Sequence, residues 1–279
     1  MVSTLAKILS DAQKSNYGVG CFNVFGYEDA KAVVHAAQEE NMPVILAANL
    51  DMVRFMPLKL IATTFETAAN MVSVPVGVHL DHTYEMDAVK AGIDAGFTSV
   101  MYDGSQLPLE ENVKNTSAIV AYAKTKGVSV EAELGSVPYA SGRDHIKSEE
   151  TNPDDVLPMV ETGINALAIS VGNIHRLEKA DVKINYDLLK KIEAITQKNH
   201  QLPLVIHGTS GIVETDIARL AKTSVCKFNI GTRIRQAYGK SYRDILEKDE
   251  KIYDRLTLMK YAMQAMQEEA RKMIKLLKG

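Results

Sequence analysis

The sequence predicts a TIM-type (β/α)8 barrel, in which eight parallel strands close on themselves inside a ring of helices. Short apolar runs alternate with longer amphipathic segments in eight successive units. The runs are almost continuously apolar, as expected of parallel strands covered by helices. Polar residues gather where the runs end, and in a barrel the carboxyl ends of the strands meet at one mouth.

The predicted elements follow one another in a regular order. The apolar runs predict strands at Val19–Val24, Val44–Ala48, Val76–Leu80, Ser99–Asp103, Ser129–Leu134, Ala166–Val171, Leu204–His207 and Val225–Ile230. Apolar residues at helical spacing predict helices at Glu28–Glu40, Leu58–Met71, Glu85–Ala95, Glu110–Lys126, Asp154–Glu161, Tyr186–Lys198 and Glu214–Lys222. Glycine or proline precedes most strands, which suits the ends of the preceding helices.

We predict a single domain over residues 1–279, with an extra C-terminal helix over about residues 253–277. The apolar stripe of this tail helix fits either packing on its own barrel or a contact between subunits. An open, doubly wound sheet is the alternative architecture. Eight successive strand–helix units favour the closed barrel.

The composition excludes several classes of protein. The chain has 279 residues, of which 46% are hydrophobic and 24% charged, as in globular proteins. Its net charge of −3 gives no general attraction to nucleic acid or anionic membranes. No apolar run approaches the roughly 18 residues of a membrane span. Cys21 and Cys226 lie in apolar runs, so we expect buried, reduced thiols and a cytoplasmic location.

Three histidines end three different predicted strands: His82, His175 and His207. Parallel strands in a closed sheet bring such ends together, and three neutral imidazoles with one open position form a catalytic zinc site. We therefore predict a metal site with Asp81 beside it, and assign His79 to its surroundings or the core. Other strand ends add further polar side chains: Asn23, Asn49, Asp103, Glu133 and Asn229.

Two loops after the seventh and eighth strands are rich in small residues. They read His207-Gly-Thr-Ser-Gly211 and Asn229-Ile-Gly-Thr232. Free backbone N–H groups at such turns favour an anion, and barrels commonly bind phosphate between these two loops. Beside a metal site, the pair of loops predicts a phosphorylated ligand.

These motifs resemble the class II fructose- and tagatose-bisphosphate aldolases. The resemblance covers essentially the whole chain, in order and with compatible spacing. It rests on His79-Leu-Asp81-His82, Ser99-Val-Met-Tyr-Asp103-Gly-Ser, Val130-Glu-Ala-Glu133-Leu-Gly, His207-Gly-Thr-Ser-Gly and Phe228-Asn229-Ile-Gly-Thr, with Thr151-Asn-Pro153 and Cys21-Phe-Asn23 also matching.

The resemblance implies zinc-dependent aldol cleavage and condensation through dihydroxyacetone phosphate. It implies that the three histidines hold zinc, that Asp81 transfers a proton at the aldehyde oxygen, and that Asp103 and Glu133 form an alternative metal position. The residues that the resemblance implies for the ketone and its phosphate are Gly208, Ser210, Asn229, Ile230, Gly231 and Thr232. We predict that Asn23, Arg176 and Thr209 bind the substrate as well. The resemblance also implies a monovalent cation, Na+ or K+, near the phosphate, and a homodimer or homotetramer.

The sequence departs from the family pattern on the ligand side. Arg176 stands where the family has glycine after its second zinc histidine, and Arg233 where an acidic residue usually follows the Asn-Ile-Gly-Thr segment. Thr209 replaces a glycine, and Asn49 lies where a small hydroxyl residue is common. Two added arginines near a phosphate site favour a more anionic ligand.

The long polar loop between Leu134 and Pro153 is predicted to be a lid over the site. The lid of the family carries a proton-abstracting glutamate, and the matching segment, Ala140–His145, has none. Asp144 and Glu149 are the candidates for this base.

We therefore predict a zinc aldolase for a phosphorylated ketose that can differ from fructose 1,6-bisphosphate. The missing lid glutamate and Arg176 also fit a sugar-phosphate-binding or regulatory barrel without turnover. Metal-dependent hydrolysis is a weaker alternative, because the first strand lacks the His-x-His signature of such barrels.

Overall fold

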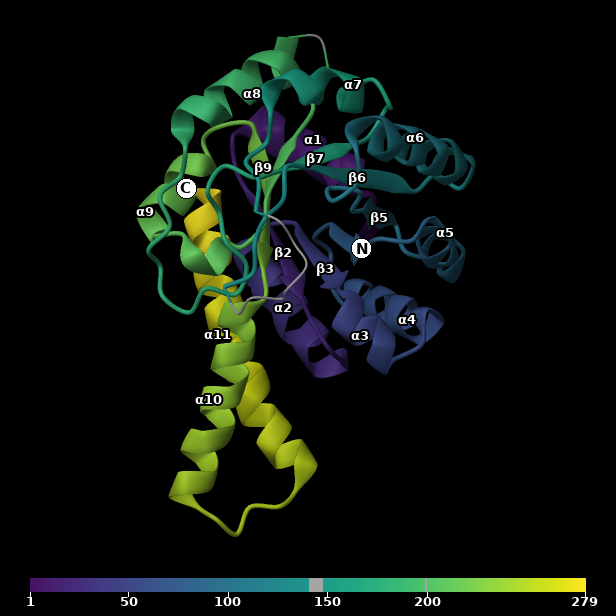
Figure 1. Cartoon of the computed structure of the whole chain (residues 1–279). Coiled ribbons are helices and arrows are strands. Elements are labelled where there is room, and N and C mark those ends of the chain that lie inside the picture. The colour runs from purple at the N-terminus through teal and green to yellow at the C-terminus, as the bar shows by residue number, and fades with distance from the viewer. Residues whose placement is uncertain (141–147, 199) are drawn as a thin grey trace.

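The computed structural model describes residues 1–140, 148–198 and 200–279, and among these residues eight strands form a closed parallel barrel (Figure 1). The strands are β2 (Val19–Asn23), β3 (Val44–Ala48), β4 (Val76–Thr83), β5 (Ser99–Tyr102), β6 (Ser129–Leu134), β7 (Ala166–Ile169), β8 (Leu204–Ile206) and β9 (Val225–Ile230). They pair in the order β4-β3-β2-β9-β8-β7-β6-β5, and β5 pairs with β4 to close the ring. The TIM barrel prediction is confirmed, and the open-sheet alternative is wrong.

Helices surround the strands in the described parts of the chain. They are α1 (Leu5–Ser15), α2 (Tyr27–Glu40), α3 (Leu50–Phe55), α4 (Leu58–Ala69), α5 (Met86–Ala95), α6 (Leu109–Thr125), α7 (Val156–Val160), α8 (Tyr186–Lys198), α9 (Glu214–Leu220), α10 (Thr232–Lys248) and α11 (Arg255–Lys278). Two 3₁₀ turns, η1 (Pro153–Asp155) and η2 (Thr209–Gly211), and a two-residue strand, β1 (Val2–Ser3), complete the elements. No helix in these described ranges has both the length and the apolar character to cross a membrane.

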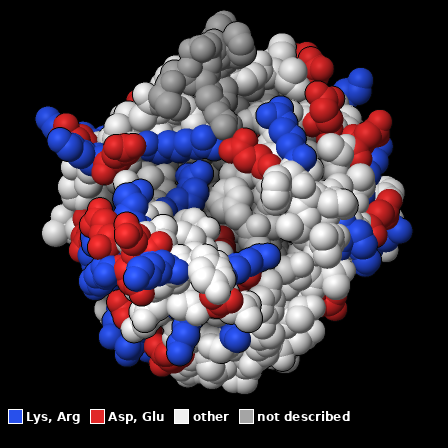
Figure 2. All heavy atoms as spheres, turned by 90° about the horizontal axis from the view of Figure 1, so that it is seen from below, with Lys and Arg blue, Asp and Glu red and all other residues white. Residues whose placement is uncertain are grey.

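The hydrophobic core has two layers. The larger layer fills the space between the strands and the outer helices. The smaller layer lies inside the barrel, where Leu5, Ile8 and Leu9 of α1 pack against inward-facing residues such as Met101 and Val205. Because α1 closes the amino-terminal end of the barrel in this way, the carboxyl end is the open one. Figure 2 looks onto that face, where charged side chains of both signs surround a central hollow.

Helix α1 shows how local sequence sets an element. Thr4 precedes the helix, and its hydroxyl oxygen accepts the backbone N–H of Lys7 at 3.3 Å. The helix ends at Asn16, which adopts the left-handed conformation with φ of 54°. Between these ends, the apolar residues recur at helical spacing and face the barrel interior.

Helices α10 and α11 form an antiparallel hairpin that projects from the carboxyl end of the barrel (Figure 1). The tail helix was predicted within a few residues of its observed bounds, whereas α10 was not predicted. Only Ile234 of α10 is buried, and the helix is strongly polar overall, so its sparse apolar residues were not recognised as a helical pattern. The two cysteines are free and buried, as expected.

Candidate active site

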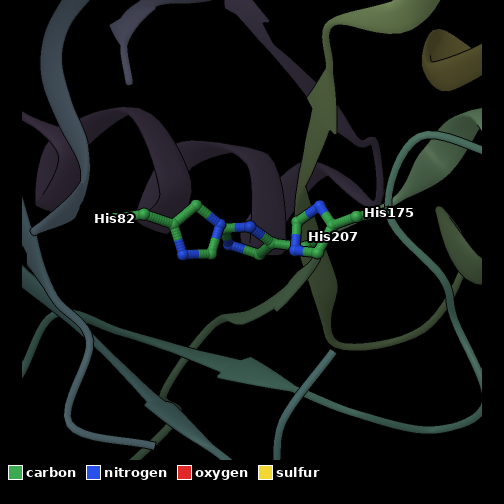
Figure 3. Close-up of side chains that lie close together, drawn as sticks. All are labelled: His82, His175 and His207. Carbon is green, nitrogen blue, oxygen red and sulfur yellow. The ribbon is translucent and has the colours of Figure 1, made fainter. Parts of the chain in front are cut away.

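The three predicted histidines converge at the carboxyl end of the barrel (Figure 3). His82 lies on β4, His175 follows β7, and His207 directly follows β8. Their ring centroids are 4.5 to 5.6 Å apart. One ligand nitrogen from each ring lies within 4.8 Å of the other two, and the group could hold a metal ion.

In His82 and in His207, a carboxylate contacts one ring nitrogen, so the other nitrogen of each ring is the one that could bind a metal. Asp103 lies 2.9 Å from Nδ1 of His82, and Glu131 lies 3.1 Å from Nε2 of His207. Because carboxylates accept hydrogen bonds, the nitrogens of these rings that could face a metal are Nε2 of His82 and Nδ1 of His207. Nδ1 of His207 also lies 3.2 Å from the amide nitrogen of Asn229. Nε2 of His82 is buried and has no hydrogen-bond partner among the described residues. Carboxylate–histidine pairs of this kind orient metal ligands, so the residues fit a metal ion.

The protonation of two of the three rings also suits a cation. Burial and the charge of His82 lower the pKa of His175 to about 3, and burial lowers the pKa of His207 well below its ordinary value for the same reasons. Both rings are therefore neutral, as metal ligands must be. Burial opposes charge on His82, but Asp81 and Asp103 outweigh it and raise its pKa.

Asp81 is held beside the histidines by two amide side chains. Asn23 donates to Oδ2 at 2.9 Å, and Asn229 donates to Oδ1 at 3.0 Å. Burial alone would raise the pKa of Asp81, but the neighbouring charges of His82 and Lys227 lower it well below its ordinary range. Asp81 is thus an ionised, fixed carboxylate at the mouth of the barrel.

A buried ion pair lies beneath the site and was not predicted. Lys227 contacts Glu131 at 2.9 Å and donates to Oδ1 of Asn229 at 2.7 Å. Glu131 in turn contacts His207, so the pair supports both a predicted metal ligand and the amide that holds Asp81. The sequence did hold a signal for this pair. Glu131 lies two residues before Glu133, and Lys227 lies two residues before Asn229, so each charge shares a strand face with a predicted site residue.

Small residues form a cradle along the side of the cavity made by the loops after β8 and β9. The residues that line it there are Gly208, Thr209, Ser210, Asn229, Gly231 and Thr232. Gly208 has φ of 69°, and a Cβ atom at this position would lie 2.3 Å from the carbonyl oxygen of Ile174. Oγ1 of Thr209 is buried without a partner among the described residues. The cradle therefore offers unused polar groups to a ligand.

One predicted ligand-binding residue, Ile230, and the added arginine Arg233 both lie away from the cavity. The side chain of Ile230 is buried in the outer core, because alternation along β9 points Asn229 inward and Ile230 outward. Arg233 pairs with Glu214 at 3.3 Å and Glu269 at 3.4 Å and does not line the cavity. Arg235 lines the cavity instead, because it shares a face of α10 with Thr232.

Arg176 does line the cavity. Its Nη2 atom lies 2.8 Å from Oδ2 of Asp51, and its guanidinium carbon lies 5.5 Å from the ring centre of Tyr139. Tyr139 stacks on His175 with the ring centres 4.5 Å apart. Asn49 has a structural role, because its side chain accepts the N–H of Met52 and begins α3.

Asp103 and Glu133 form a second group with His82 that could hold a metal. Burial and the charge of Asp103 raise the pKa of Glu133, and its Oε2 atom is buried without a partner among the described residues. His79 is buried, with Nδ1 2.9 Å from Oγ of Ser99, as assigned. Of the two lid candidates, Asp144 lies outside the described residues. The side chain of Glu149 is exposed, while its backbone pairs with Ser136 at the base of the loop.

Fold and site together are those of a TIM barrel whose open end carries three histidines that could hold a metal ion, beside a cradle of small polar residues. Residues 3–279 match the family model described as class II fructose-bisphosphate aldolase. The chain therefore belongs to the class II fructose-bisphosphate aldolase family, and an aldolase function follows from that membership.

Individual relatives agree with the family match. A fructose-bisphosphate aldolase of Staphylococcus aureus (strain Mu50 / ATCC 700699) is 36% identical over 285 residues, covering 98% of this chain and 96% of that protein. A fructose-bisphosphate aldolase of Geobacillus stearothermophilus is 38% identical over 264 residues, covering 90% and 88%. The solved structure of the YdjI aldolase from Escherichia coli K12 has a TM-score of 0.86 and 28% identity, covering 99% of this chain and 97% of that one.

Proposed function

We propose that this protein is a zinc-dependent aldolase that cleaves and forms a phosphorylated ketose through dihydroxyacetone phosphate and an aldehyde. The observation that carries the proposal is the convergence of His82, His175 and His207 beside the ionised carboxylate of Asp81. Zinc held by these histidines would supply a Lewis acid for the ketone oxygen. The other chemical tasks fall to side chains of this chain.

Asp81 is suited to move the proton at the second oxygen. In cleavage, its carboxylate accepts the proton of the substrate hydroxyl whose carbon becomes the aldehyde. In condensation, it returns that proton to the aldehyde oxygen. Its bonds to Asn23 and Asn229 support this role, because they fix both carboxylate oxygens before the substrate arrives.

We assign the ketone phosphate to the cradle of Gly208, Thr209, Ser210, Gly231 and Thr232. The buried, unpartnered hydroxyl of Thr209 and the start of the 17-residue helix α10 at Thr232 support this assignment. A monovalent cation near the phosphate, a cytoplasmic location and a homodimer or homotetramer remain predictions. Asp144 and Glu149 remain the predicted candidates for the base that takes the proton from the ketone carbon.

The test separates catalysis from binding alone. The protein is stripped with a chelator, reloaded with zinc, and incubated with dihydroxyacetone phosphate in heavy water. Zinc-dependent exchange of the proton next to the ketone, with release of dihydroxyacetone phosphate from some member of a panel of ketose phosphates, is the expected result. Binding without exchange would favour the regulatory alternative.

Two variants sharpen this test. His175→Gln should lose bound zinc and lower exchange about a hundredfold or more, whereas His35→Gln on α2 should leave both unchanged. Asp81→Asn should lower cleavage by about a hundred- to ten-thousandfold while exchange falls far less, because Asp81 acts at the aldehyde end. An equal fall of both rates in Asp81→Asn would refute its assigned role.

A further inference from the structure

The ion pair between Arg176 and Asp51 crosses the mouth of the barrel. Arg176 follows β7 and Asp51 follows β3. In the ring order β3-β2-β9-β8-β7, these strands lie four places apart, which is the opposite side of an eight-stranded barrel. The distance between Nη2 and Oδ2 is nevertheless 2.8 Å. The backbone of Arg176 thus lies on the cradle side of the cavity, while its guanidinium reaches the side of β3.

The backbone of Arg176 adopts a conformation that ordinary residues avoid. Its φ angle is 57°, and the left-handed region costs a residue with a Cβ atom about 1–2 kcal/mol. Asn16 and Asn41 share this conformation at the ends of α1 and α2. Among the described residues, Arg176 and His82 are the two non-glycine residues of this kind that line the cavity. Strain that persists at a site points to a function there.

The ion pair is accessible to a ligand. The side chains of Arg176 and Asp51 are 27% and 34% exposed, and both line the cavity with the three histidines. The ring of Tyr139 beneath the guanidinium limits its movement. The bond to Asp51 uses one nitrogen of a planar group whose several N–H donors match a carboxylate or phosphate.

We propose that Arg176 determines substrate specificity by binding a second anionic group of the substrate, at the end remote from the ketone phosphate. The carboxylate of Asp51, 2.8 Å from the guanidinium, marks the place that this anion takes. The substrate class is therefore a ketose phosphate with a phosphate or a carboxylate at its other end. This inference rests on the proposed aldolase function, because it assigns one end of the substrate of that reaction.

The experiment compares aldehydes that differ in charge. Zinc-loaded protein condenses dihydroxyacetone phosphate with glyceraldehyde 3-phosphate or glyceraldehyde, and with 4-oxobutanoate or butanal. We expect kcat/KM to favour at least one charged aldehyde over its neutral counterpart by about tenfold or more. The pair with the larger ratio distinguishes phosphate from carboxylate. Arg176→Gln should reduce that ratio to about one, mainly through KM, and Arg176→Lys should keep part of it.

Controls separate this inference from the function on which it depends. Arg219→Gln, which removes a cation stacked on Tyr186 at 3.7 Å and away from the cavity, should keep the wild-type preference. Proton exchange of dihydroxyacetone phosphate is measured for every variant. Its absence in the wild type would refute the aldolase proposal itself. Intact exchange without any charge preference, or an unchanged preference in Arg176→Gln, would overturn the role of Arg176 alone.

Two further outcomes test the role of Asp51 and the end of the substrate that Arg176 binds. Asp51→Asn should lower KM for charged aldehydes several-fold, because the internal competitor loses its charge. An unchanged or higher KM would contradict the exchange between Asp51 and the ligand. Loss of exchange in Arg176→Gln would show that the arginine serves the phosphate half of the site, and would overturn its assignment to the remote end.

Discussion

Lys227 is a fully buried cation whose partners all belong to the site or support it. Burial opposes its charge, but the nearby acidic groups, Glu131 among them, raise its pKa and keep it protonated. Its bond to Oδ1 of Asn229 fixes the amide so that the NH₂ group faces Asp81. If an apolar group replaced the ammonium group of Lys227, Glu131 would remain as a buried charge without its main partner.

We therefore expect Lys227→Met to lower the free energy of unfolding by about 3–5 kcal/mol. Urea unfolding followed by circular dichroism measures this loss. The double variant Lys227→Met, Glu131→Gln should recover part of it, because no unpaired charge remains. If the double variant is as unstable as the sum of the two single variants, the ion pair is not the source of the effect.

Cys226 allows a prediction about pH. Burial raises the pKa of its thiol to about 12, from an ordinary value near 9. Above pH 9 the unfolded chain therefore releases a proton that the folded chain retains, and stability falls as the pH rises. From pH 9 to pH 10 this one thiol should cost roughly 1 kcal/mol.

Urea unfolding at pH 8 and pH 10 tests this prediction. The Cys226→Ala variant should lose less stability over this interval than the wild type does. Equal losses in the two proteins would show that the thiol does not contribute to the decline.

At the residue scale, the sequence revealed the groups that end strands and not those that lie within them. His82, His175 and His207 could be grouped because parallel strands bring their ends together. The role of Lys227 depends on Glu131, which is distant in sequence, and no local pattern pairs them. Arg233 was noted as an added cation near the phosphate site and Arg235 was overlooked, because the helical phase of α10 was not recognised.

Helix α11 has two halves with different environments. From Ala262 to Leu277 its apolar residues are buried, and α2 is the helix against which it mainly packs. Near its start, Leu256 is 76% exposed, and Tyr253 just before the helix is 93% exposed. Packing on its own barrel is therefore right for the second half. A subunit contact remains a prediction for the first half.

A matched pair of variants tests this division. Met273→Ala should lower the free energy of unfolding by about 2–5 kcal/mol, because it opens a cavity in the core. Leu256→Ala should change it by less than about 0.5 kcal/mol in the isolated chain. A loss for Leu256→Ala that grows with protein concentration would show instead that a second copy covers this residue.

At the element scale, the barrel strands and seven of the helices around them were predicted within a few residues, because their apolar patterns reflect burial. The prediction ended β4 at Leu80, yet the strand continues to Thr83. Asp81 and His82 are polar residues at a functional site, and polar residues at the end of an apolar run suggest a loop. Helix α10 was missed for the opposite reason, since it projects from the barrel and few of its residues are buried.

The whole molecule should respond to metal, because the three histidines come from segments distant in sequence. Zinc that binds only the folded chain stabilises it by about 4 kcal/mol at a free concentration a thousand times Kd. For a chain of this size, that raises Tm by about seven degrees. Calorimetry of the stripped and reloaded protein measures the shift. His175→Gln should show little of it, and a full shift in that variant would place the metal elsewhere.

Closure of the amino-terminal end by α1 has a consequence for the kinetics of the reaction. Both reactants of a condensation must enter through the open carboxyl end of the barrel, which the Arg176–Asp51 ion pair spans. The ketone phosphate, which is assigned to the cradle, then has to bind first and be released last. The aldehyde binds and leaves above it. We therefore expect an ordered kinetic mechanism, in which the aldehyde is the second substrate to bind in condensation and the first product released in cleavage.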